Sequence, residues 1–346
     1  MANKTLSNAS KAKEDEFYTE LSDIENELKH YKHHFKGKVV LCNCDDPRIS
    51  NFFHYFSYNF EQLGLKKLIT TCYKNQERDL FSQNNSERAI WLEYTGDRNG
   101  NRVPDPEEIG INYLKGDGDF RSPECVELLK QADIVVTNPP FSLFREYVAQ
   151  LIKYEKKFVI IGNQNAITYK DIFTNIKANQ LWLGSSLSFA KFRVPDYYEP
   201  RATRFWVDET GQKWRSMGNI CWFTNLDIAK RHEELILYKS YNSEEYPHYD
   251  NYDAINVNKV AEIPMNYDGA MGVPITFLDK YNPNQFDILG LMASTTIDDI
   301  NFGYPYVNGK KIYARILIRR KQPAAYIQPD EQLPQAAEPQ NKYNGK

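Results

Sequence analysis

The stretch that decides the fold is DIVVTNPPFSLFREYV, which runs from Asp133 to Val148. Four apolar or β-branched residues precede the prolines and predict a buried strand that ends at Thr137, and the amphipathic run after them predicts a helix over Leu143–Tyr154. The two consecutive prolines remove two backbone donors and fix two φ angles. A plain turn would be served by Asn-Gly or Asp-Gly. We therefore interpret Asn138–Phe141 as a rigid turn whose bare carbonyls serve a function.

Strands and helices alternate on both sides of this turn, which predicts a mostly parallel sheet with helices on both faces. A polar excursion, Gln76–Pro106, interrupts the alternation and is expected to hold a hairpin around Trp91–Val103. The predicted strands are Lys38–Cys44, Lys67–Cys72, Ile111–Lys115, Asp133–Thr137, Lys157–Gly162, Leu181–Gly184 and Asn219–Leu226. The predicted helices are Leu21–Phe35, Pro47–Leu63, a segment opened by Ser122-Pro123-Glu124, Leu143–Tyr154 and Thr168–Ala178.

Polar residues gather where four of the predicted strands end. Parallel α/β sheets bind ligands at the carboxyl ends of their strands. One polar strand end carries little information, but four in one sheet predict a binding site along that edge. The four clusters are Asn43–Asp46, Cys72–Lys74, Asp117–Asp119 and Asn138–Phe141.

The composition limits the class of protein. The chain has 346 residues, 41% of them hydrophobic, which suffices for two domains or one large one. No apolar run approaches the ~20 residues of a membrane span, and no signal peptide is read at the N-terminus. The odd number of cysteines indicates reduced thiols in a cytoplasmic protein. No Cys or His pair follows Cys42 and Cys44 at ligand spacing, so no metal site is predicted.

Composition also suggests where the chain divides. Residues 1–240 carry the alternating pattern, with a loop-rich insertion at about 184–218. Residues 241–321 lack the alternation, and we interpret them as a smaller, irregular α+β module that ends in the basic run KKIYARILIRRK. Residues 322–346 are rich in Pro, Gln, Ala and Glu, a composition typical of a disordered tail.

The Asn-Pro-Pro-Phe turn resembles motif IV of the amino-group DNA methyltransferases, although a tight strand-to-helix turn is an alternative for four letters alone. Further segments between Asp15 and Leu278 resemble, in the same order, the EcoRI-type adenine-specific methyltransferases. They are DEFYTELSDIENEL, VVLCNCDDPRISNFF, LGLKKLI, GDGDFRS, DIVVTNPPFSLFREY, YDNYDAINVNK and GVPITFL. The resemblance implies the class I S-adenosylmethionine-dependent methyltransferase fold, with a seven-stranded sheet and a smaller module that recognises DNA.

The same resemblance implies a site-specific enzyme that moves a methyl group from S-adenosylmethionine to N6 of an adenine flipped out of double-stranded DNA. It further implies a cytoplasmic monomer, the modification half of a restriction-modification system, with a cognate endonuclease as possible partner. The residues agree, because the delocalised N6 lone pair needs hydrogen-bond acceptors to become nucleophilic. Asn138 offers its side-chain oxygen, and Pro139 offers a carbonyl held still by Pro140. Phe141 is expected to stack on the base, rather than to serve as a core aromatic.

The resemblance places the cofactor across the other strand ends. Asp45 and Asp46 stand where the family pattern is glycine-rich, and an acidic pair can hold the methionine ammonium. Asp117 follows the third strand, where an acceptor for the cofactor's adenine amine is expected, whereas Asp119 fits a simple turn. The residues expected around the cofactor are Phe17, Tyr18, Thr19, Asn43, Asp45, Asp46, Cys72, Tyr73, Asp117 and Phe120.

Contacts to DNA are expected from basic residues in irregular segments. The net charge is −3, so such contacts need local basic patches. A charged run is also what a solvated face looks like. The expected contacts are Lys191, Arg193, Arg201 and Arg204 in the insertion, and Lys310, Lys311 and Arg315 in the C-terminal module.

Two other functions fit parts of the pattern. The same turn occurs in enzymes that methylate RNA or a protein glutamine, although these more often carry Tyr at the fourth position. A catalytically silent relative that only binds nucleic acid is the other alternative. The intact Asn138–Phe141 turn and the acidic strand ends argue against such decay.

Overall fold

The computed structural model describes residues 17–43, 50–72, 89–101, 104–105, 108–186, 189, 191–196 and 198–321. At its centre lies an eight-stranded sheet in the order β4-β3-β2-β1-β5-β6-β11-β7. Neighbouring strands among β2, β1, β5 and β6 are parallel, and β11 runs antiparallel to both β6 and β7. The predicted mostly parallel α/β sheet is therefore confirmed. The strands are β1 (Val39–Asn43), β2 (Lys67–Thr71), β3 (Ile90–Tyr94), β4 (Gly110–Tyr113), β5 (Ile134–Thr137), β6 (Lys157–Asn163), β7 (Trp182–Leu183) and β11 (Ile220–Thr224).

One strand of the sheet was not predicted as such. β3 lies within the polar excursion and pairs antiparallel with β2 on one side and with β4 on the other. Its sequence IWLEY alternates buried and half-buried residues, which is the pattern of a strand with one covered face. The predicted hairpin within Trp91–Val103 was therefore wrong. β3 forms its antiparallel pair with the later strand that begins at Gly110. β4 forms the edge of the sheet.

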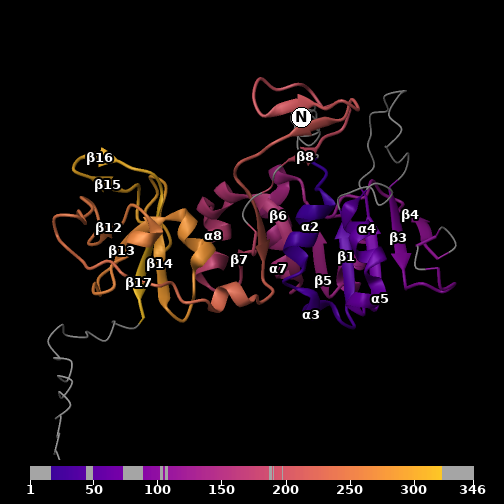
Figure 1. Ribbon diagram of the computed structural model, residues 1–346, viewed down its shortest axis with the longest axis horizontal. Helices are drawn as coiled ribbons and strands as arrows, with labels where there is room; N and C mark the ends of the chain where they lie inside the picture. The colour runs from indigo at the N-terminus through magenta and orange to yellow at the C-terminus, as the bar shows by residue number, and fades with distance from the viewer. Residues whose placement is uncertain are drawn as a thin grey trace, which may run out of the picture.

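Both faces of the sheet are apolar, as expected for parallel strands covered by helices. Alternate residues point to opposite faces, so Leu41 and Val135 join one core cluster, whereas Val40 and Val136 join the other. α6, α7 and α8 cover the first face, and α2, α3, α4 and α5 cover the second (Figure 1). The helices are α2 (Leu21–Leu28), α3 (Lys32–Phe35), α4 (Asn51–Tyr58), α5 (Phe60–Leu63), α6 (Pro123–Gln131), α7 (Phe144–Lys153) and α8 (Lys170–Lys177).

The insertion forms its own three-stranded antiparallel sheet, β8-β10-β9, which stands above the central sheet in Figure 1. Its first strand also pairs with the start of the described chain. The backbone N–H of Tyr18 donates to the carbonyl of Arg193 at 2.8 Å, and the Arg193 N–H returns a bond of 3.2 Å. These two backbone hydrogen bonds join the insertion to the N-terminal segment. The strands are β8 (Phe192–Arg193), β9 (Phe205–Val207) and β10 (Lys213–Arg215).

The C-terminal part is built around a four-stranded sheet, β12-β13-β17-β14, beside α8 (Figure 1). The basic run KKIYARILIRRK is divided between two sheets, because β16 belongs to a separate hairpin with β15 and β17 to the four-stranded sheet. The strands are β12 (Ile255–Asn256), β13 (Met271–Pro274), β14 (Phe286–Met292), β15 (Tyr306–Val307), β16 (Lys310–Lys311) and β17 (Arg315–Arg320). Short 3-10 helices complete the chain, namely η1 (Phe141–Leu143), η2 (Gln164–Thr168), η3 (Ala229–His232), η4 (Val260–Glu262) and η5 (Ile275–Lys280).

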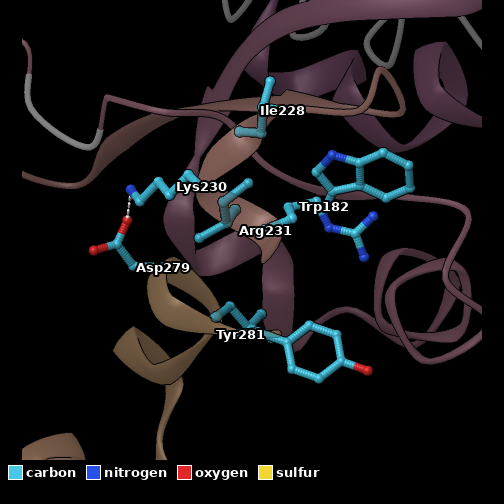
Figure 2. A pocket seen from close by; sticks show the side chains of 8 residues that line it. Trp182, Ile228, Lys230, Arg231, Asp279 and Tyr281 are labelled. Carbon is cyan, nitrogen blue, oxygen red and sulfur yellow. Dashed lines mark hydrogen bonds and ion pairs between the residues drawn. The ribbon is translucent and has the colours of Figure 1, made fainter. Parts of the chain in front are cut away.

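A small pocket marks the joint between this part and the central sheet (Figure 2). The guanidinium of Arg231 lies 3.7 Å from the centre of the Trp182 ring, and burial lowers the pKa of Arg231. Lys230 pairs with Asp279 of η5 and donates to the carbonyl of Ser185 at 2.8 Å. These contacts tie η3 to both β7 and η5. Nowhere in the described chain is a helix both long and apolar enough to span a membrane.

Candidate active site

The Asn-Pro-Pro-Phe turn stands at the carboxyl end of β5, as predicted. The chain leaves the strand at Thr137 and enters η1 at Phe141, and α7 follows directly. The carbonyl of Pro140 accepts a hydrogen bond from Leu143 N–H at 3.0 Å, which closes the turn. Pro139 is buried and Pro140 is half-buried. The two prolines thus hold the backbone beside Asn138 in one conformation.

The side chain of Asn138 is buried and oriented by the N-terminal segment. Its Nδ2 donates to the backbone carbonyl of Phe17 at 2.6 Å and lies 3.4 Å from Oγ1 of Thr19. Because the nitrogen of the amide serves these two acceptors, the oxygen is the acceptor that the side chain can offer to a substrate. The orientation is set by residues more than a hundred positions earlier in the chain, which sequence reasoning could not assign.

A second set of hydrogen bonds joins the ends of β1 and β5. Thr137 Oγ1 donates to the carbonyl of Asn43, and the hydroxyl of Tyr147 donates to Oδ1 of Asn43. All three residues are buried. Asn43, expected at the cofactor, therefore also anchors α7 to the sheet. Thr137 and Tyr147 were missed, although a hydroxyl at a strand end is a visible signal.

Aromatic rings converge on the turn. The rings of Phe17 and Phe141 are stacked, with centroids 5.6 Å apart and planes 22° apart. Phe192 meets the Phe17 ring edge-on at 5.8 Å, and Tyr198 meets it at 6.0 Å. Phe17 is buried, whereas Phe141 keeps part of its surface exposed. The half-exposed Phe141 ring beside Asn138 is suited to stacking on a planar ligand.

The loop after β4 packs tightly against the end of β2. Gly118 has φ +82°, and a Cβ there would overlap the carbonyl oxygen of Cys72. Only glycine therefore fits the loop at this point. Asp117 is partly exposed beside it and accepts a hydrogen bond from the Asp119 N–H at 3.0 Å. The polar ends of β2 and β4 thus lie together, although β3 separates the two strands.

Two neighbours in this loop differ in what they offer a ligand. Asp119 pairs with Arg121 at 2.6 Å. Burial alone would raise the pKa of Asp119, but the hydrogen bonds and charge of Arg121 hold it below its ordinary value. Phe120 is buried and meets the Tyr147 ring edge-on at 5.0 Å. Asp119 is therefore bound within the turn, while Phe120 lies beneath the strand ends.

The remaining residues expected at the cofactor are only partly described. Asp45, Asp46 and Tyr73 lie outside the described residues. Tyr18, Thr19 and Cys72 are buried. Tyr18 and Thr19 adjoin the Asn-Pro-Pro-Phe turn through Phe17 and Asn138, and Cys72 abuts the loop at Gly118. No group of acidic, His and Cys residues suited to a metal occurs within the described ranges.

The basic residues expected to contact DNA fall into two groups. In the insertion, Lys191 lies over the Trp214 ring at 3.6 Å and Arg193 over the Tyr18 ring at 5.1 Å. Arg201 and Arg204 are exposed. Lys191 and Arg193 lie at β8, which pairs with the N-terminal segment, whereas Arg201 and Arg204 lie in the segment before β9.

The second group is divided by burial. Lys310 and Lys311 are exposed on the β15–β16 hairpin, and Lys311 lies over the Tyr304 ring at 3.1 Å. Arg315 instead is buried, and its Nε donates to Oδ1 of Asn256 at 3.2 Å. Its guanidinium serves the module's own core and faces no open surface. The strand alternation of β17 turns this side chain inward.

Sequence reasoning also missed Arg215 on β10. Its guanidinium carbon lies 5.9 Å from the Tyr198 ring, which also has Phe17 and Phe205 as neighbours. Two of its nitrogens, Nε and Nη1, are buried, and no group in the described chain accepts their hydrogens. Buried charged donors normally have partners. Arg215 thus carries two buried donors beside the aromatic cluster that no described protein group satisfies.

Comparisons with known proteins identify the family of the chain. The family model described as "Adenine-specific methyltransferase EcoRI" matches residues 5–321. The Type II methyltransferase M.EcoRI of Escherichia coli is 51% identical over 323 residues, which is 92% of this chain and 97% of that protein. The Type II methyltransferases M.MgeORF184P of Mycoplasma genitalium and M.MpnI of Mycoplasma pneumoniae are 41% and 38% identical, over 91% of this chain and 98% and 97% of their own.

No solved structure matches the chain significantly. The family model, however, covers nearly all of it, including the strand ends and the Asn-Pro-Pro-Phe turn. The identity to the E. coli protein extends over almost the full length of both chains. The chain therefore belongs to the family of EcoRI adenine-specific methyltransferases.

Proposed function

We propose that this protein transfers a methyl group from S-adenosylmethionine to the N6 amine of an adenine flipped out of double-stranded DNA. The observation that carries the proposal is the buried Asn138 amide beside the half-exposed Phe141 ring at the end of β5. The cofactor supplies a methyl group on a sulfonium, which is a good leaving group. The C–S bond breaks as the C–N bond forms, and N6 releases one proton to solvent.

The residues of the turn account for the activation of N6. The Asn138 side-chain oxygen and the Pro139 carbonyl accept the two N6 hydrogens, which shifts electron density onto the nitrogen. Phe17 and Thr19 hold the Asn138 amide from behind, so the acceptor is oriented before the base arrives. Such preorganised acceptors stabilise the transition state more in a site that excludes water. Pro140 fixes the turn, and Phe141 stacks on the extruded base.

The cofactor is proposed to lie across the ends of β1, β2 and β4. The glycine at position 118, which no side chain could replace without overlap, permits this loop to approach β2 and supports a bound adenosine there. Asp117 is the proposed acceptor for the adenine amine, with Phe120 beneath it. Asn43, Asp45 and Asp46 would hold the methionine part. We propose that this arrangement follows the class I methyltransferase pattern, with β3 as an additional strand.

Duplex DNA is proposed to bind across the insertion and the β15–β16 hairpin. The cations Lys191, Arg193, Arg201, Arg204, Lys310 and Lys311 would contact phosphates, whereas the buried Arg315 would support β17. We propose a methyltransferase domain at residues 1–240, a recognition module at 241–321 and a tail at 322–346. We further propose that the protein acts as a monomer and modifies the site of a cognate endonuclease; the names of the relatives, which are Type II methyltransferases, support only the modification role.

Transfer of tritiated methyl groups to duplex DNA, RNA and protein tests the substrate class. The proposal expects label in duplex DNA, at a rate strongly reduced by Asn138→Ala. Label in RNA or protein alone would support the alternative enzymes. DNA binding without any transfer would indicate a silent relative. Either result would contradict the proposal.

A further inference from the structure

The pairing of Phe17 with Phe141 is not explained by a role in the core alone. Phe141 packs at the margin of its cluster and stays partly exposed, yet a second ring lies almost parallel to it. Their centroids are 5.6 Å apart. A base stacked on both faces needs about 3.4 Å on each side, the spacing of bases in DNA, so two flanking rings would stand about 7 Å apart.

The Phe17 ring is also backed on its far side. Phe192 meets it edge-on and Tyr198 lies beside it, so it forms the front of an aromatic wall. The backbone pairing of Tyr18 with Arg193 attaches this wall to β8. The Phe17 carbonyl holds the Asn138 amide. The same residue thus touches the proposed catalytic amide and faces the proposed stacking ring.

We propose that the extruded adenine inserts between Phe17 and Phe141, so that Phe17 stacks on the face of the base opposite Phe141. In the structure the two rings lie against each other, and they must move apart by about the thickness of one base, ~3.4 Å, to admit it. Two-sided stacking would keep the base plane fixed while its N6 edge meets Asn138. This inference rests on the proposed function, because it concerns the adenine that the proposed reaction uses.

A place between the base and the aromatic wall differs from the place around the cofactor that the resemblance implies for Phe17. A residue beside the cofactor should face the ends of β1, β2 and β4. The described rings that Phe17 meets are Phe141, Phe192 and Tyr198, and none belongs to those strand ends. The two roles make opposite predictions for cofactor affinity, which separates them.

The test compares Phe17→Leu, which keeps apolar bulk but removes the ring, with Phe17→Trp, which keeps a stacking surface. Each is assayed with 2-aminopurine at the target adenine, by single-turnover methyl transfer, and by calorimetric titration with S-adenosylmethionine. We expect Phe17→Leu to lower the flipping equilibrium and the single-turnover rate about tenfold or more, as for loss of one base–aromatic stack. Phe17→Trp should restore both, and cofactor affinity should stay within about twofold of the parent.

Phe189→Leu is the matched control. Phe189 stacks on Phe192 at 5.2 Å in the same cluster and is separated from Phe17 by that one ring. The Phe189→Leu protein should therefore flip and methylate the target adenine at nearly the parental level. Equal losses of base flipping and methyl transfer in Phe189→Leu and Phe17→Leu would overturn the inference. They would show that disturbed packing of the aromatic cluster, rather than a lost stack on the base, causes the effect.

Weaker cofactor binding with normal flipping in Phe17→Leu would also overturn it, in favour of a cofactor lid. If Phe17→Leu does not fold, the Phe17→Trp protein provides the test, because it keeps a stacking surface. A folded Phe17→Trp protein that does not flip the base would contradict the inference. A parent protein that methylates no DNA would instead refute the proposed function itself.

Discussion

At the scale of single residues, Asn138 is the group on which the chemistry depends. Asn138→Ala removes a preorganised acceptor of the transition state, so single-turnover methyl transfer should fall by on the order of 10²-fold or more. Affinity for S-adenosylmethionine should change little, because the amide contacts Phe17 and Thr19 and not the loop at Asp117. Single-turnover assays measure the rate of methyl transfer, and calorimetric titration measures the affinity for S-adenosylmethionine. A parental rate in a folded Asn138→Ala protein would remove Asn138 from the reaction.

Asp117 has the complementary role at this scale. Its partly exposed carboxylate stands at the end of β4 beside Gly118, where the adenosine is proposed to lie. Asp117→Ala should weaken cofactor binding by about 1.5–3 kcal/mol, the value of a hydrogen bond to a charged group. Asp119→Ala is a useful comparison, because Asp119 is engaged by Arg121. Unchanged cofactor affinity in a folded Asp117→Ala protein would exclude this residue from the site.

At the scale of elements, α2 carries a carboxylate whose ionisation opposes folding. Burial, and next the charge of Glu20, raise the pKa of Asp23 from 3.8 to about 6. The protonated form is favoured in the native state, so its stabilising contribution is complete below pH 3.8 and is lost as pH rises through about 6. The free energy of unfolding of Asp23→Asn should therefore equal that of the parent at pH ~4. Above pH ~7 it should be larger than that of the parent by about 1–2 kcal/mol, a value reduced to allow for solvent screening. Urea unfolding across this pH range is the measurement, and a pH-independent difference would refute the assignment.

The elements also show what the sequence could predict. The β5–turn–α7 unit was located to within a residue or two, because β-branching, the double proline and helical spacing are local signals. The pairing predicted for β3 was wrong. Its partners, β2 and β4, precede and follow the long excursion in the sequence, and only the tertiary fold brings them to β3. Arg315 looked like a surface cation in a basic run, but strand alternation turns it toward Asn256. The Phe17–Phe141 stack and the surroundings of Arg215 depend on the tertiary fold. Such long-range contacts produce no periodic pattern in the sequence from which they could be predicted.

At the scale of the whole molecule, the insertion brings cations to the edge of the sheet where the chemistry is proposed. Replacing Arg193, Arg201 and Arg204 together should weaken duplex binding and reduce the slope of log affinity against log salt, since each phosphate contact releases condensed counterions. Arg215→Ala should also weaken binding if its two unpartnered nitrogens meet a DNA acceptor. Fluorescence anisotropy over a range of salt concentrations measures the slopes. Slopes equal to that of the parent would mean that the three arginines do not touch the backbone.

The position of the transferred methyl group tests the central claim most directly. Duplex DNA is incubated with the protein and isotope-labelled S-adenosylmethionine, then digested to nucleosides and analysed by mass spectrometry. The account predicts label in N6-methyldeoxyadenosine, absent from cytosine, and nearly abolished by Asn138→Ala. Label on cytosine, no label in DNA with the parent protein, or full labelling of adenine by Asn138→Ala would contradict it.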